Sequence, residues 1–173
     1  SMPIFAQERT GDLAVLDVRA GTNLPTEINL VLLSQIMREE AVKATGFRVM
    51  TKENIFAILQ DKGINPSKCA DVECEVQYGR VLQADKLVAG EVSLVGSTYY
   101  LSFNLYDAPT AAIDKSITKE CDRCNFRQMV SLVRDTAKEL FAGMEAPVKE
   151  REREIGEKPE KWELKELEEI VKF

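Results

Sequence analysis

The chain has 173 residues, enough for one domain with its own hydrophobic core but not for two domains of ordinary size. It carries 23 Lys and Arg against 29 Asp and Glu, and this net charge of −6 argues against a protein that binds nucleic-acid backbones. It has no histidine, which excludes Ser-His-Asp and Cys-His catalysis and histidine metal sites. No apolar run approaches the roughly 20 residues that cross a membrane.

Charge density divides the sequence into a body and a tail. Residues 145–173 hold 17 charged side chains in 29 positions and few large apolar residues, as a separate solvated segment would. We expect a leader or tag remnant at 1–12, a folded domain at 13–144 and a charged tail at 145–173. Within the leader, the residues after Met2 are interpreted as the end of a signal peptide, with a short leader of no targeting meaning as the alternative.

Hydrophobic periodicity in the first half of the body predicts strands alternating with helices. The apolar run that opens it and a second short run flank a long segment of helical spacing, which implies a crossover and a parallel pair of strands. Thr51 and Asp71 are expected to cap the two following helices. The expected elements are a strand at 13–18, a helix at 26–45, a strand at 47–50, a helix at 51–63 and a helix at 71–83.

The second half of the body changes to a period of two residues, which predicts a meander of strands. Gly96 and Ser97 form the two-residue connection of a tight hairpin. Asn125 and Gln128 then have the spacing of a capping box before a strongly amphipathic helix. The expected elements are strands at 86–95, 98–107 and 112–121 and a helix that starts after Asn125 and stops at Gly143. The whole order, β-α-β-α-α-β-β-β-α, predicts an α/β domain of the α+β type with a mixed sheet.

Two tyrosines and a lysine of the meander are candidate contact residues. Tyr100 and Tyr106 lie opposite the alternating apolar residues of their strand, so we expect them on a face that a partner contacts, with cover by a helix as the alternative. Lys115 lies in the last strand, where a lysine suits an exposed sheet edge and a partner could be met.

The element order and five segments of the body carry a resemblance to a known family. The segments are 13–18, 45–54, 82–92, 99–107 and 136–144. They resemble the amino-terminal domain of TolB, the periplasmic propeller protein of the Tol-Pal system, and are also similar to the curli secretion channel protein and to lipoprotein activators of penicillin-binding proteins. The resemblance implies an extracytoplasmic, non-catalytic module that binds other envelope proteins. The charged tail and the four cysteines depart from the TolB pattern.

The four cysteines occur as two close pairs, which allow three pairings. Cys69 and Cys74 form a C-x4-C motif, and Cys121 and Cys124 form a C-x2-C motif. Local disulfides are favoured in an oxidising compartment, and paired cysteines in the two corresponding loops resemble those of a subset of envelope proteins with this domain. A four-thiolate zinc site and dithiol redox catalysis are the alternatives.

The tail contains a further candidate contact surface. Trp162, Leu167 and Ile170 fall on one stripe of a predicted amphipathic helix whose other positions are mostly Glu and Lys. Such a helix can dock on a partner. Docking on the chain's own body and a solvated linker are the alternatives.

We therefore predict a binding or assembly module of the bacterial envelope and not an enzyme. No glycine-rich phosphate loop occurs, and we expect no cofactor and no metal. The expected partners are other envelope proteins, with a homo-oligomer as a further expectation and no nucleic acid. The expected location is periplasmic or associated with the outer membrane. A thiol-redox or structural-zinc protein built on the cysteines is the alternative.

Overall fold

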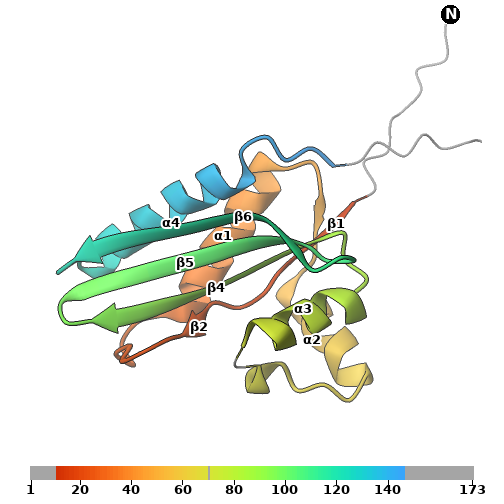
Figure 1. Ribbon diagram of the computed structural model, residues 1–173, viewed down its shortest axis with the longest axis horizontal. Helices are drawn as coiled ribbons and strands as arrows, with labels where there is room; N and C mark the ends of the chain where they lie inside the picture. Colours follow the sequence, from red (N-terminus) through yellow and green to blue (C-terminus); the bar gives the residue numbers. More distant parts are fainter. Residues whose placement is uncertain (1–10, 70, 147–173) are drawn as a thin grey trace, which may run out of the picture. The chain divides into compact units, whose positions relative to one another are not determined.

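The computed structural model describes residues 11–146 except Ala70. Residues 1–10 of the expected leader and residues 147–173 of the expected tail, with Trp162, Leu167 and Ile170, lie outside the described residues. Within them, the elements in chain order (Figure 1) are β1 (Asp12–Val15), β2 (Arg19–Ala20), α1 (Leu30–Ala44), β3 (Arg48–Val49), α2 (Lys52–Asp61), the 3-10 helix η1 (Pro66–Lys68), α3 (Val72–Val81), β4 (Lys86–Val95), β5 (Thr98–Asp107), β6 (Ala112–Asp122) and α4 (Phe126–Phe141).

Three of the four α-helices between residues 11 and 146 begin at the caps that the sequence predicts. The side chains of Thr51, Asp71 and Asn125 each accept a hydrogen bond from a backbone N–H in the first turn of α2, α3 and α4. Oε1 of Gln128 accepts a hydrogen bond from the backbone N–H of Asn125 at 2.9 Å, which completes the capping box. These bonds satisfy N–H groups that a helix leaves without partners at its start, so the helix positions are set locally by the sequence.

The first long helix starts later than the sequence predicts. We expected it from Thr26, but Asn29 accepts a hydrogen bond from the backbone N–H of Leu32 at 3.0 Å and caps α1 there. Val31, near the start of α1, is 59% exposed and lies outside the buried face of the helix. The buried residues of α1 are Leu33, Ser34, Ile36, Met37, Glu40 and Ala41.

The sheet is mixed, as predicted, with strand order β3-β1-β4-β5-β6 and with β2 paired to β4. The pairs β1–β3, β1–β4 and β2–β4 are parallel, whereas β4–β5 and β5–β6 are antiparallel. The hairpin at Gly96 is confirmed, because Val95 pairs directly with Thr98. β6 lies at one edge, and a register shift between Leu105 and Tyr106 interrupts its pairing with β5. The expected α+β fold is confirmed.

The strand predicted at 13–18 ends at Val15 as β1, and a second short strand, β2, begins after a break at Arg19. Between them, the backbone N–H of Val18 donates to the Ser34 hydroxyl at 2.8 Å, and the Val15 carbonyl accepts from Nε of Arg38 at 3.1 Å. Both side chains belong to α1, which therefore takes the place of a strand neighbour at this point. Buried backbone groups need such partners, and these bonds end the regular ladder.

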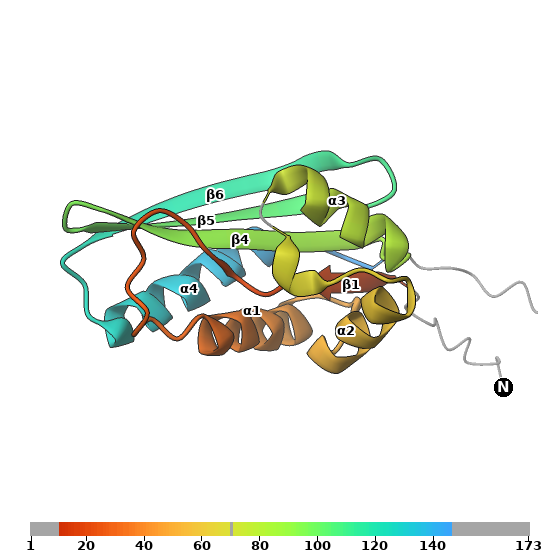
Figure 2. The ribbon, with the colours of Figure 1, turned by 90° about the horizontal axis from the view of Figure 1, so that it is seen from below.

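Helices cover the two faces of the sheet unequally. α1 and α4 run side by side along one face, and α2 and α3 lie on the other face near β1 (Figures 1 and 2). Between α1 and α4, the nearly buried carboxylate of Glu40 pairs with Arg134 at 2.9 Å. Burial raises the pKa of Glu40, but Arg134 and Lys43 outweigh burial and hold the pKa below its usual value. Among the described residues, no helix combines the length and apolar character needed to cross a bilayer.

We predict that Gly90→Ala destabilises the fold. Gly90 lies opposite Phe103 in the β4–β5 pair, and a Cβ at position 90 would meet the Phe103 ring and lie 2.8 Å from the Ser102 carbonyl oxygen. Such overpacking costs about 1–3 kcal/mol. The free energy of unfolding in urea measures it, with Val95→Ala at a site that is 57% exposed as the control. Equal midpoints for Gly90→Ala and the wild type would contradict this packing.

Candidate functional site

A pocket of about 580 Å³ opens at the break between β1 and β2, against α2, η1 and α3. Val18, Ile55, Leu59 and Tyr78 line it, and each is at most 6% exposed. Phe56, also a lining residue, is 44% exposed. The pocket therefore combines a buried apolar floor with an aromatic side chain at its mouth, which is the anatomy of a site that accepts an apolar group.

Two cations share one carboxylate at the side of the pocket formed by α1 and α2. Nη2 of Arg38 lies 2.6 Å from Oδ1 of Asp17, and Nζ of Lys52 lies 3.3 Å from Oδ2 of the same residue. Lys52 is the first residue of α2, where the helix dipole adds positive potential. Burial raises the pKa of Asp17, but Arg38 and Lys52 outweigh burial and hold the pKa below its usual value.

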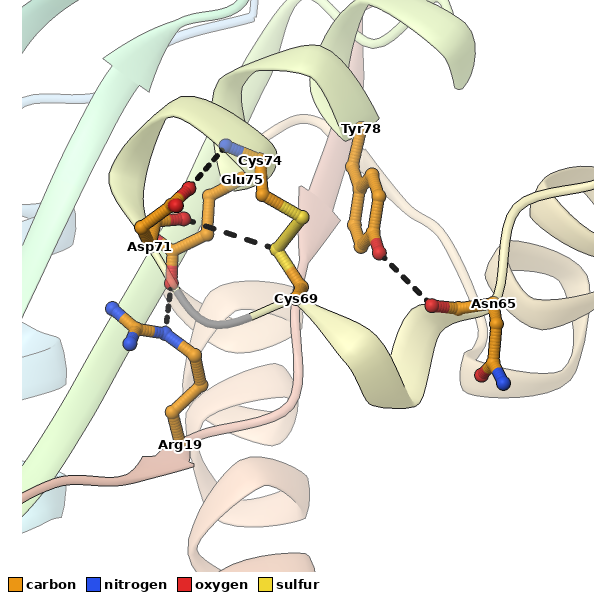
Figure 3. Close-up of a disulfide and its surroundings, with 7 residues drawn as sticks. All are labelled: Arg19, Asn65, Cys69, Asp71, Cys74, Glu75 and Tyr78. Carbon is orange, nitrogen blue, oxygen red and sulfur yellow. Dashed lines mark hydrogen bonds and ion pairs between the residues drawn. A yellow bond between two sulfur atoms is a disulfide. The ribbon is translucent and has the colours of Figure 1, made fainter.

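Two carboxylates share one cation at the side where α3 lines the pocket; Arg19 and Glu75 are lining residues, and Glu91 of β4 lies outside the lining, beside Arg19. Nε of Arg19 donates to Glu75 (Figure 3), and Nη1 of Arg19 lies 3.4 Å from Glu91. The Glu75 side chain is only 4% exposed, whereas that of Glu91 is 41% exposed. Burial raises the pKa of Glu75 above its usual value, and Arg19 offsets the effect only in part.

The Cys69–Cys74 disulfide joins the end of η1 to the first turn of α3 (Figure 3). Cys69 itself lines the pocket. One turn further along α3, the Tyr78 hydroxyl donates to the carbonyl of Asn65 at 3.1 Å, which ties the loop to the helix a second time (Figure 3). The disulfide and this hydrogen bond fix one wall of the pocket.

The second disulfide, Cys121–Cys124, lies away from the pocket, between β6 and α4. All four cysteines are thus paired locally, which was the favoured expectation. Zinc ligation needs free thiolates, so paired cysteines do not favour the zinc alternative. Cys121 and Cys124 both precede the N-cap of α4, so neither opens a helix whose dipole would lower the thiol pKa, and the dithiol alternative is not favoured either. In the part of the chain that the structure describes, no three His, Cys, Asp or Glu side chains come together as metal ligands.

The predicted contact residues of the meander are not brought together. Tyr100 is half-buried in β5, opposite Glu120 of β6. The expectation that Tyr106 is available to a partner is wrong, because it is 1% exposed in the core beneath α3 and is covered by helices. Nζ of Lys115 lies 3.0 Å from the carbonyl of Glu139, so this lysine holds the end of α4 to the edge strand.

The pocket was not predicted from the sequence. Asp17, Arg38 and Lys52 were not among the predicted site residues. One signal was present: Asp17 and Arg19 are charged residues within and just after an apolar run that predicts a buried strand. Charges at such positions need partners from other elements, and here α1, α2 and α3 supply them.

Comparisons with known proteins find the same fold. No family model and no curated protein matches the sequence. Among solved structures, the LpoB C-terminal domain from Salmonella enterica matches at 17% identity and a TM-score of 0.56, over 65% of this chain and 82% of that chain. A dodecamer of a PelC variant from Paraburkholderia phytofirmans matches at 17% identity and a TM-score of 0.50, over 78% of this chain and 92% of that chain.

TolB from Acinetobacter baumannii matches at 12% identity and a TM-score of 0.46, over 81% of this chain and 30% of that chain. At such identities a likeness shows the fold alone. The LpoB likeness confirms, at the level of the fold, the resemblance to TolB-like envelope proteins that the sequence analysis expected.

We predict opposite pH dependences for the two carboxylates of the pocket. The raised pKa of Glu75 means that the unfolded chain loses this proton first as pH rises, so wild-type stability falls between the usual and the raised pKa. Glu75→Gln therefore gains stability relative to the wild type as pH rises through this range.

The pKa of Asp17 is lowered, so the stability that Asp17 contributes is present above its usual pKa and is lost as pH falls through the lowered one. Asp17→Asn therefore loses stability relative to the wild type as pH rises. Urea unfolding at a series of pH values measures both differences. If the difference in unfolding free energy from the wild type changed in the same direction with pH for both variants, the opposite pKa shifts of Glu75 and Asp17 would be contradicted.

We predict that both disulfides stabilise the fold but that only one shapes the pocket. From the entropy of loop closure, each of these short-loop disulfides should contribute about 2 kcal/mol to the free energy of unfolding. Replacing Cys69 and Cys74 by Ser should also shift the amide NMR signals of Phe56 and Tyr78. Replacing Cys121 and Cys124 by Ser, the matched control, should lower stability and leave those signals in place. Equal shifts in the two double variants would contradict the separation of roles.

Proposed function

We propose that this chain is a non-catalytic protein-binding module of the bacterial cell envelope, and that the pocket at the β1–β2 break is its docking site. The observation that carries the proposal is the apolar floor with Phe56 exposed at the mouth, surrounded by ion pairs. Binding hot spots have this form, with a desolvated centre inside a polar rim. The side chains of the rim that titrate are engaged in ion pairs, which suits recognition better than proton transfer.

The fold and the disulfides support the envelope as the location. The likeness to LpoB supports a protein of this class, and two local disulfides suit an oxidising compartment outside the cytoplasm. The partners we propose are other envelope proteins. We also propose that the chain forms a homo-oligomer, because the PelC structure, which has this fold, is a dodecamer.

The tail beyond residue 146 belongs to the same proposal. We propose that Trp162, Leu167 and Ile170 form a second contact stripe, on a segment separate from the folded body at 13–144. A chain that ends at residue 146 separates the two contributions, because it retains the pocket and lacks the stripe.

A photo-crosslinking side chain at position 56 tests the docking site, and one at position 42 is the matched control. Both positions are exposed on helices, but Val42 lies on α1, which covers the other face of the sheet. We predict that position 56 crosslinks to an envelope protein in cells and position 42 does not. Loss of the tail should weaken this crosslink without abolishing it.

A variant with a blocked pocket provides the second arm. Lys52 lines the pocket, is exposed and lies one turn before Phe56 on α2, so Lys52→Trp should cover the mouth and leave the core intact. The crosslink from position 56 should then disappear while the unfolding midpoint stays near that of the wild type. A crosslink that persists in Lys52→Trp, or that forms equally from position 42, would show that the pocket is not the docking site.

A further inference from the structure

The charges around the pocket are distributed unevenly between its two sides. On the side of α1 and α2, Arg38 and Lys52 share the single carboxylate of Asp17. On the side of α3 and β4, Glu75 and Glu91 share the single guanidinium of Arg19. Among these ion pairs the first side has one excess positive charge and the second has one excess negative charge.

The two sides are close enough for one short ligand to span them. Asp17 and Arg19 are two residues apart, which is about 7 Å in extended chain, and their ion pairs reach outward to α2 and α3 in different directions. The floor between the two sides is apolar, with Leu59 fully buried. A ligand that enters the pocket thus meets positive charge, then an apolar surface, then negative charge.

The exposed members of each side are the ones that a ligand can reach. The side chains of Lys52, Asp17 and Glu91 are 44%, 49% and 41% exposed, whereas those of Arg38 and Glu75 are 14% and 4% exposed. Lys52 is thus the cation that an acidic ligand group can reach, beside the carboxylate that it shares with Arg38, and Glu91 is the acid that a basic group can reach. Partly exposed ion pairs are weak, so a ligand's charged groups can compete for them.

We propose that the pocket binds a peptide segment in which an apolar side chain, best an aromatic one, lies between an acidic and a basic residue. The apolar side chain enters beside Phe56 and Tyr78, the acidic group faces Lys52, and the basic group faces Glu91. This inference rests on the proposed docking function and specifies the partner's chemistry. Charge complementarity of this kind selects partners more than it adds affinity.

Two synthetic peptides and one charge reversal test the proposal. The probes are acetyl-Asp-Gly-Phe-Gly-Lys-amide and acetyl-Lys-Gly-Phe-Gly-Lys-amide, whose flexible glycines let all three side chains turn to the pocket. Titration of the full chain is followed by the amide NMR signals of Phe56, Leu59 and Tyr78. The wild type should prefer the peptide that carries Asp by about threefold to fivefold, the range expected for an exposed ion pair.

Lys52→Glu should reverse this preference by a similar factor, so that the peptide with two lysines binds more tightly than it does to the wild type. A gain of binding cannot arise from unfolding, and an acidic residue suits the first turn of a helix. Lys62→Glu changes the net charge equally at the other end of α2 and should keep the wild-type preference.

The outcomes separate this inference from the docking function. Suppose that both peptides shift the amide signals of Phe56, Leu59 and Tyr78 while Lys52→Glu leaves the peptide preference unchanged, or while Lys62→Glu changes it equally. Either result overturns the proposed pairing of the ligand's charges with Lys52 and Glu91, and the pocket still stands as the docking site. If neither peptide shifts those signals, the peptide chemistry is overturned. The crosslink from position 56 then decides on its own whether the docking function survives.

Discussion

The structure depends on the interruption of its first strand. α1 supplies Ser34 and Arg38 to the backbone between β1 and β2, so regular pairing stops there although both strands remain beside β4. Because the ladder is broken, Asp17 and Arg19 are directed to different helices and form ion pairs with α2 and α3. The pocket follows from this local departure from regular structure and does not need an added domain or loop.

The pocket wall is held in place before any partner arrives. The Cys69–Cys74 disulfide and the Tyr78 hydrogen bond both restrain the loop that carries η1. Such a wall loses little conformational freedom on binding, so less of the interaction energy is spent on ordering it. A module of this kind can bind a short segment with a modest contact area, because the cost of forming the site has been met during folding.

The sequence predicts local features well and long-range features poorly. The caps at Thr51, Asp71 and Asn125 depend on neighbouring residues and were predicted, as was the hairpin at Gly96. The strand break depends on Ser34 and Arg38, which are distant in the sequence and carry no local signal. The alternation of apolar and polar residues in the sequence of β5 distinguished the two faces of the strand. It did not show that α3 covers one of these faces, and for that reason the prediction for Tyr106 was wrong. The site joins elements that are far apart in the sequence, so only its individual charges were visible in the sequence.

The edge strand β6 has a consequence for behaviour at high concentration. An exposed edge can template strand addition between identical chains and so lead to aggregation. If two copies of β6 paired antiparallel about Ile117, Lys115 would oppose Lys119 and Asp114 would oppose Glu120, which places like charges together at four positions. The register shift beside Tyr106 further distorts this end of the β5–β6 ladder. The edge is thus protected against self-pairing in this register, which lowers the tendency to aggregate through β6 at high concentration.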